Sequence, residues 1–156
     1  MKTLILYYSK YGTTQKCAQK LADKIEGGAD IAGYKERKKV NLSDYDTVII
    51  GAPVYMGMLK KMKAYCEANL QKLLTKKVGL FVCHMDYETP MTDKIGGYFP
   101  QQLIDHATAI QGFGGAYDTA KMGAFDKFVF EKVAKETGPS DKVDYAAIDE
   151  FAKAMA

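Results

Sequence analysis

The stretch Leu4-Ile5-Leu6-Tyr7-Tyr8-Ser9-Lys10-Tyr11-Gly12-Thr13-Thr14 decides the predicted fold. Its first five residues form an apolar run that is typical of a strand buried on both faces. A short loop rich in hydroxyl groups follows, in which Gly12 lets the backbone turn close to a ligand. A helical pattern comes next, and the first turn of a helix offers unpaired N–H groups and partial positive charge. The strand, the loop and the helix start together predict a pocket for a phosphate group.

A simpler interpretation of the same stretch stays open at this point. An ordinary strand-to-helix turn, in which a Thr side chain caps the helix, would use the same residue types. Two other phosphate-binding motifs are excluded by the sequence. The pattern Gly-x-x-x-x-Gly-Lys-Ser/Thr does not occur, and Gly-x-Gly-x-x-Gly does not follow the first strand.

Length and composition predict one globular domain that spans residues 1–156. Of the 156 residues, 47% are hydrophobic and 26% are charged, which is an ordinary globular balance. No apolar run approaches the ~20 residues of a membrane span. The apolar start faintly resembles a signal peptide, but residues 7–10 cut it short and no small-residue cleavage site follows. We therefore expect a cytoplasmic protein.

Charge and cysteine content argue against several kinds of site. The formal net charge of +3 is mild and no long basic run occurs, so nucleic acid binding is not expected. Cys17, Cys66 and Cys83 lie far apart and form no Cys-x-x-Cys pair, so neither a zinc site nor a dithiol redox motif is predicted. Buried thiols are expected, and Cys83 beside His84 is expected to be inert rather than nucleophilic. His106 is expected to be structural.

Apolar periodicity predicts strands that alternate with helices. Strands are predicted at residues 4–8, 30–34, 47–52, 77–83 and 109–115, and helical faces at 17–25, 59–74, 99–106, 124–136 and 143–155. Asp144 is placed to cap the last helix, and residues 41–46 leave room for one turn at most. The alternation predicts an α/β fold, a doubly wound five-stranded parallel sheet with helices on both faces. Ligands of such sheets bind beyond the carboxyl ends of the strands, where the loops after the first and third strands would meet.

The loop at residues 9–14 resembles the phosphate loop of flavodoxins, whose pattern is Ser/Thr-x-Ser/Thr-Gly-x-Thr. Tyr11 departs from this pattern because it moves a hydroxyl outward from where a small residue is usual. Residues 50–57 and 112–118, with Lys121, Met122 and the helical segment from Phe125 to Lys135, are similar to the flavodoxin-domain branch that includes menaquinone-dependent protoporphyrinogen oxidases. This resemblance implies the strand order 2-1-3-4-5 and an extra segment, residues 117–141, between the last strand and the last helix.

The resemblance also implies FMN as the cofactor. The residues implied to hold its phosphate are Ser9, Lys10, Tyr11, Gly12, Thr13 and Thr14. Those implied to lie along one side of the isoalloxazine are Pro53, Val54, Tyr55, Met56 and Gly57, and those on the other side are His84, Met85, Asp86 and Tyr87. Tyr55 and Tyr87 are the candidates to stack on the ring. No catalytic residue and no metal ligand is implied, because the flavin carries the redox chemistry.

Two functions fit this resemblance. The first is a flavodoxin-like redox protein that carries electrons between partners, and the second is a quinone-linked flavoenzyme of the protoporphyrinogen oxidase type. The partner is accordingly a redox protein or a quinone. A signalling receiver domain on the same fold is disfavoured, because it would need acidic residues near the strand ends and none follow Tyr8.

Basic residues near the predicted flavin site leave two interpretations open. Lys60, Lys61 and Lys63 lie at the start of a predicted helix, where positive charge opposes the macrodipole. They form either a solvated face or a docking site for an acidic partner or a carboxylate-bearing substrate. Three lysines of the extra segment could extend this basic surface. The three are Lys121, Lys127 and Lys132. The apolar face of the helix predicted at 124–136 could meet a quinone or a membrane surface. A plain core helix explains the same apolar residues equally well.

Overall fold

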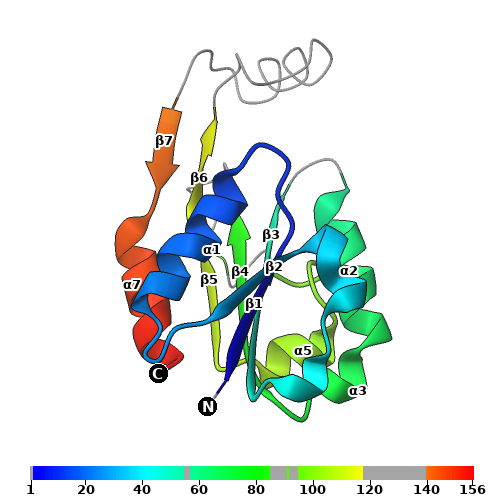
Figure 1. Ribbon diagram of the computed structural model, residues 1–156. Coiled ribbons are helices and arrows are strands. Elements are labelled where there is room, and N and C mark those ends of the chain that lie inside the picture. The colour runs from blue at the N-terminus through cyan, green and yellow to red at the C-terminus, as the bar shows by residue number, and fades with distance from the viewer. Residues whose placement is uncertain (1, 55–56, 85–90, 92–94, 118–139) are drawn as a thin grey trace.

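The computed structural model describes residues 2–54, 57–84, 91, 95–117 and 140–156. Five parallel strands form its main sheet, in the order β2-β1-β3-β4-β5 (Figure 1). They are β1 (Thr3–Tyr7), β2 (Asp30–Gly33), β3 (Thr47–Pro53), β4 (Lys77–Cys83) and β5 (Ala109–Gly112). Strand β1 pairs with both β2 and β3, so the strand order reverses beside it. The predicted sheet and its order are confirmed.

Helices cover both faces of this sheet (Figure 1). On one face lie α1 (Thr13–Lys24) and α7 (Tyr145–Ala154), and on the other lie α2 (Met58–Ala68), α3 (Leu70–Leu73) and α5 (Gln101–His106). Side chains alternate across a strand, so Leu4 and Leu6 pack in the core under α2 while Ile5 packs under α1. Burial on both faces explains why the central strands are continuous apolar runs rather than alternating ones.

Three phenylalanines hold α7 against the sheet. The ring of Phe81 stacks on Phe113 with centroids 4.7 Å apart, and Phe151 of α7 meets Phe113 edge-on at 5.4 Å. Such pairs contribute about 0.5–1.5 kcal/mol each beyond the area that they bury. Gly51 of β3 makes room for this cluster, because a Cβ there would collide with the Phe81 ring.

The connections between strands differ from the predictions in two places. The single helix predicted at 59–74 is broken, because Asn69 leaves the helical conformation and donates its side-chain N–H to the Tyr65 carbonyl oxygen at 2.9 Å. The charged residues after β2 form a 3₁₀ helix, η1 (Tyr34–Lys39). The one turn allowed before β3 is present as η2 (Leu42–Asp44), with Asn41 accepting a hydrogen bond from the Ser43 N–H.

The last predicted strand is divided. Strand β5 ends at Gly112, the Phe113 side chain enters the core, and β6 (Gly114–Tyr117) then pairs antiparallel with β7 (Ser140–Val143). Strand β7 was not predicted, because four residues of polar and small character carry no clear period. The two strands bracket the extra segment, and the helix predicted at 124–136 lies outside the described residues. Asp144 caps α7 as predicted, accepting a hydrogen bond from Ala147 N at 2.9 Å.

Among the helices that the structure describes, none combines the length and the apolar character needed to cross a bilayer.

Candidate functional site

The loops after β1, β3 and β4 leave the same edge of the sheet, the upper edge in Figure 1. The register aligns their ends, since Tyr7 pairs with Gly51 and Pro53 pairs with Cys83. Two backbone hydrogen bonds continue this alignment into the loops. Tyr8 N donates to the Gly51 oxygen at 3.0 Å, and Val54 N donates to the Cys83 oxygen at 2.9 Å. The prediction that these loops meet is therefore confirmed.

The loop after β1 turns back on itself before α1 begins. Gly12 N donates to Ser9 Oγ at 3.1 Å, and Gly12 itself is left-handed, with φ of 94° and ψ of −7°. A side chain at this φ costs roughly 1–2 kcal/mol, so glycine suits the position. Gly12 is the N-cap of α1, and it provides no side-chain cap. The alternative of a Thr-capped turn is therefore wrong, because both threonines lie inside the helix.

An uncapped start leaves the first N–H groups of α1 without partners inside the helix. The first turn also has no acidic residue that would compensate the helix dipole. Helix α2 begins in the same way at Gly57, with φ of 82° and no side-chain cap. Against the described residues, a Cβ added at Gly12 or Gly57 would meet no atom within 4 Å. Two helix starts without a side-chain cap thus lie at the edge where ligands of this fold class bind.

The hydroxyl groups of the loop are used in different ways. Thr13 Oγ1 donates to the Ala116 carbonyl oxygen at 2.7 Å, so its proton is directed at β6. Thr14 is 1% exposed, and its side chain hydrogen-bonds to the Cys83 sulfur. Ser9 Oγ accepts from Gly12, which leaves its own proton for donation elsewhere. Of the three hydroxyls in Ser9, Thr13 and Thr14, only that of Ser9 is placed to donate to an anion above the loop.

The predicted residues of the other two loops are described in part. Val54 is 42% exposed, an apolar side chain presented at the carboxyl edge, and Pro53 is half-buried. His84 donates its backbone N–H to the Gly114 oxygen at 2.8 Å, and its ring lies against Gly112, where a Cβ would overlap it. The His84 ring therefore contacts β5. Five predicted residues lie outside the described part of the chain: Tyr55, Met56, Met85, Asp86 and Tyr87.

A stack of three side chains borders the phosphate loop and was missed from the sequence. Tyr8, the residue before Ser9, stacks on Tyr34 with ring centroids 4.5 Å apart. Arg37 lies over the Tyr34 ring, with its guanidinium carbon 4.1 Å from the ring centroid. Its Nη1 also donates a hydrogen bond to the Tyr34 carbonyl oxygen at 3.1 Å. Burial raises the pKa of the Tyr65 phenol in α2, and the positive charge of Arg37 partly opposes this rise. This stack connects η1 to the phosphate loop. The sequence gives no local signal for it, because Tyr8 and Tyr34 come together only through the parallel pairing of β1 with β2.

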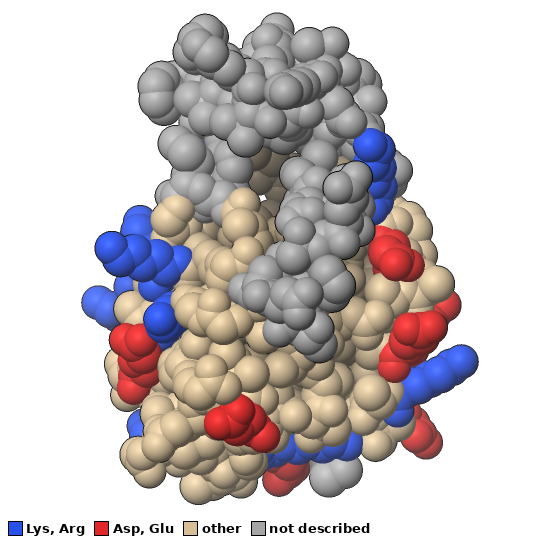
Figure 2. Space-filling view, turned by 180° about the vertical axis from the view of Figure 1, so that it is seen from behind, with Lys and Arg blue, Asp and Glu red and all other residues tan. Residues whose placement is uncertain are grey.

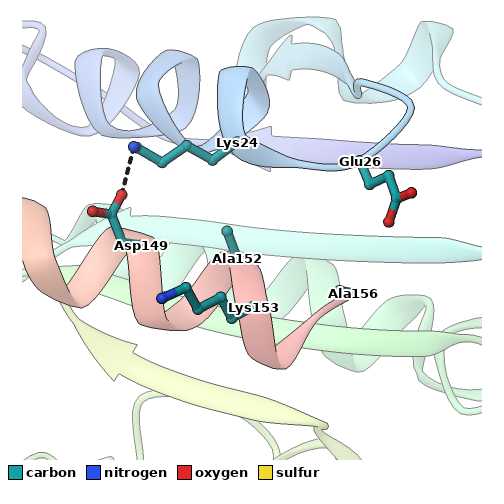
Figure 3. A pocket seen from close by; sticks show the side chains of 6 residues that line it. All are labelled: Lys24, Glu26, Asp149, Ala152, Lys153 and Ala156. Atoms are coloured by element: carbon teal, nitrogen blue, oxygen red, sulfur yellow. Dashed lines mark ion pairs between the residues drawn. The ribbon is translucent and has the colours of Figure 1, made fainter.

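A hollow of about 450 Å³ lies at the far end of α1 from the phosphate loop (Figure 3). Its lining side chains come from the end of α1, the residues after it and α7; they are Lys24, Glu26, Asp149, Ala152, Lys153 and Ala156. Lys24 Nζ lies 2.6 Å from Asp149 Oδ1, and both side chains are nearly half exposed. An exposed ion pair of this kind contributes little. In the described ranges, no group of His, Cys, Asp or Glu could hold a metal ion.

The fold and the site define a class: a doubly wound α/β protein in which two uncapped helix starts face the switch point of the sheet. Residues 4–144 match the flavodoxin domain, and the chain belongs to this family. The resemblance drawn from the phosphate loop is thereby confirmed.

Individual relatives agree with the family. The protoporphyrinogen IX dehydrogenase (quinone) of Leishmania major is 25% identical over an alignment of 172 residues, gaps included. The alignment covers 99% of this chain and 74% of that protein. Flavodoxin 2 of Bacillus cereus superposes with a TM-score of 0.57 at 16% identity, covering 99% of this chain and 97% of that one. A Fusobacterium nucleatum flavodoxin bound to flavin mononucleotide gives a TM-score of 0.53 at 15% identity, covering 98% and 96%. At these identities the superpositions show a shared fold.

Proposed function

We propose that this chain binds FMN at the carboxyl edge of its sheet and carries electrons between redox partners. The observation that carries the proposal is the pair of uncapped, glycine-initiated helices α1 and α2 at that edge. By contrast, α7 begins at the same edge of the sheet, with Tyr145 beside Lys16 of α1, and its start is capped by an Asp side chain. Backbone N–H groups left unpaired at a helix start bind phosphate well, since donor groups and dipole act together.

The described residues fit the cofactor. The N–H groups at the start of α1 and the Ser9 hydroxyl are donors to a phosphate, and Gly12 lets the anion approach the backbone. The exposed Val54 side chain would cover part of the flavin ring, together with its neighbours Pro53 and Gly57. On the opposite side of the ring we assign contacts to the residues that follow β4, namely His84, Met85, Asp86 and Tyr87.

When bound, FMN supplies reversible acceptance of electrons. The chain contributes placement and shielding. Ser9, Lys10, Tyr11, Gly12, Thr13 and Thr14 surround the phosphate in this proposal, with Thr13 and Thr14 acting through their backbone N–H groups. Their hydroxyls already bond to Ala116 and Cys83, and these bonds fix the first turn of α1 in position.

A pair of titrations tests the cofactor assignment. Chain stripped of ligand is titrated with FMN and, separately, with riboflavin, which has the same ring and no phosphate. We expect FMN to bind about 100-fold more tightly, because charge-assisted hydrogen bonds to the phosphate contribute about 1.5–3 kcal/mol each. Equal affinity for the two flavins would contradict a phosphate-binding role for the loop. Binding of neither flavin would contradict the assignment of FMN as the cofactor.

A quinone-linked oxidase of protoporphyrinogen is the second candidate, and two observations favour it. The Leishmania major relative has this activity in its name, and the similarity runs over nearly the whole of this chain. Exposed Lys60 and Lys61 lie in the first turn of α2, which follows the loop after β3. Basic side chains gather on the left side of the face shown in Figure 2. Porphyrin carboxylates are suitable partners for such a surface.

Turnover separates the two functions. The FMN-loaded chain is incubated with protoporphyrinogen and a quinone, and product is followed by its absorbance. Catalytic oxidation at many cycles per chain supports the enzyme, whereas a carrier exchanges electrons with protein partners and leaves protoporphyrinogen unchanged beyond its slow reaction in buffer.

A further inference from the structure

Two cysteines that are 66 residues apart in the chain meet beneath the candidate site. Cys83 Sγ lies 3.7 Å from Cys17 Sγ, and the pair is buried, with Cys17 0% and Cys83 5% exposed. Cys17 belongs to the second turn of α1, and Cys83 is the last residue of β4. The Cys83–Cys17 contact is thus a link between the helix that begins at the phosphate loop and the strand that ends at the site.

We infer that Cys17 and Cys83 are an oxidation site, at which a peroxide converts two thiols into a disulfide within the folded chain. All three cysteines of the chain are thiols in this structure. A disulfide requires the sulfur atoms to approach to about 2.05 Å, so a movement of under ~2 Å joins them. Both side chains already point at each other, because one sulfur donates a hydrogen bond to the other.

The reaction balances in two steps. The Cys83 sulfur attacks a peroxide oxygen, the O–O bond breaks, and a sulfenic acid and one water (from hydrogen peroxide) are formed. The Cys17 sulfur then attacks the Cys83 sulfur, the S–O bond breaks, and a second water leaves. Two thiols and one hydrogen peroxide thus give one disulfide and two waters. Cys83, which the sequence predicts to be inert, reacts first in this proposal because it is the more exposed of the two and lies at the edge of the sheet. The hydrogen bond with Cys17 and burial raise the pKa of the Cys83 thiol, so the reaction with peroxide is slow.

The third cysteine cannot replace either partner. Cys66 of α2 packs in the core on the opposite face of the sheet from Cys17 and Cys83, and it is 0% exposed. An intramolecular disulfide involving Cys66 would require the chain to unfold. The fold therefore selects one of the three pairings that the sequence allows.

The cross-link would act on the first turn of α1. The Thr14 side chain bonds to Cys83, and the Cys83 carbonyl oxygen accepts from Val54 N at 2.9 Å. A bond from α1 to β4 at this point fixes the phosphate loop relative to the loop after β3. It also closes a long loop, which lowers the entropy of the unfolded chain. The oxidised chain should accordingly unfold at a temperature about 5–10 °C higher than the reduced chain.

Peptide mapping tests this inference without any use of the cofactor. The full chain, with no flavin added, is treated with hydrogen peroxide, and the folded monomer is collected by gel filtration and digested without reducing agent. We expect a product that has lost two hydrogen atoms and links the Cys17 peptide to the Cys83 peptide, and we expect a thiol reductant to reverse it. Cys66→Ser is the matched control and should give the same link, whereas Cys17→Ser and Cys83→Ser should abolish it.

Two results would overturn the inference. One is a folded monomer that keeps three thiols, or carries a sulfinic acid at Cys83 without a link. The other is a disulfide that includes Cys66. The map of the unsubstituted chain decides between these outcomes even if a variant does not fold. Because no flavin takes part, failure here leaves the FMN proposal unaffected, and failure to bind FMN leaves the disulfide unaffected.

Discussion

Thr13 Oγ1 donates a hydrogen bond of 2.7 Å to the carbonyl oxygen of Ala116, and this bond ties the first turn of α1 to β6. The two residues are 103 positions apart in the chain. The phosphate loop and the strand that leads into the extra segment are therefore one connected unit. Thr13 occupies the unspecified position between Gly12 and Thr14 in the flavodoxin pattern, and its hydroxyl holds the backbone of a neighbouring strand.

Replacing Thr13 with Val tests this connection. The variant keeps the β-branched shape and loses the donor, so the Ala116 oxygen is left without this bond, at a cost of about 1–2 kcal/mol in the free energy of unfolding. Denaturant unfolding measures the loss. Thr13→Ser keeps the hydroxyl and should remain within about 0.5 kcal/mol of the parent chain. FMN affinity should fall less than about tenfold in Thr13→Val, since the backbone N–H groups remain. A larger fall in FMN affinity would indicate that the Thr13 hydroxyl contacts the phosphate directly.

Two glycines at opposite ends of α1 allow a matched test of the phosphate loop. Gly12 and Gly27 have φ of 94° and 81°, and neither would bring a Cβ within 4 Å of a described atom. Substitution by Ala should therefore cost each variant a similar ~1–2 kcal/mol of stability through backbone strain. Only Gly12→Ala should also weaken FMN binding, by about tenfold or more. The added Cβ would occupy space that the phosphate needs, and backbone strain would displace the turn that holds the phosphate. Titration of both folded variants with FMN makes the comparison. Equal affinities would place the anion elsewhere.

The parts of the fold that sequence predicted are those in which a residue pattern has one physical cause. Leu4 to Tyr7 and Val48 to Ile50 are apolar on both faces because helices cover both faces of the sheet. Gly12 and Asp144 mark helix starts for local steric and hydrogen-bonding reasons. Such signals lie within a few residues of the feature that they predict.

The remainder depends on contacts between distant residues. Strand β7 forms only because β6 lies beside it, and Phe113 divides the last strand because Phe81 and Phe151 receive its ring. Likewise, Cys17 and Cys83 looked unrelated in sequence and meet through the packing of α1 on β4. No local period encodes these pairings, so the sequence alone left them out.

Tyr45 offers a test of a titrating group away from the site. Its hydroxyl donates to Asp30 Oδ2 at 2.7 Å, and this hydrogen bond, followed by burial and the carboxylate charges, raises the pKa of Tyr45 from 10.0 to about 12. A pKa raised by folding means that the protonated phenol stabilises the fold. This contribution is complete below pH 10 and is lost as the pH rises from 10.0 to about 12.

Tyr45→Phe should remove that contribution. Because the bond is solvent-exposed, the loss below pH 10 should be at most about 1 kcal/mol after allowance for screening. Denaturant unfolding at pH 8 and at alkaline pH, with both chains, should show two stability curves that converge as the pH approaches 12. A difference that stays constant across this range would show that packing of the ring, and not the bond to Asp30, is what the substitution removes.

The lysines at the start of α2 give the prediction that bears most directly on partners. Lys60 and Lys61 are exposed and Lys63 is half-buried, and their charges oppose the dipole of the helix that they begin. If these charges steer an acidic partner or a carboxylate substrate, replacing all three with Gln should slow the bimolecular reaction about tenfold at low salt and leave FMN affinity unchanged. The difference should shrink as ionic strength rises, since exposed charges are screened over about 10 Å at 0.1 M salt. Lys72→Gln, at an exposed position of α3, is the control and should react like the parent chain. Equal rates for the triple variant and the parent at low salt would make the three lysines a solvated face with no part in recognition.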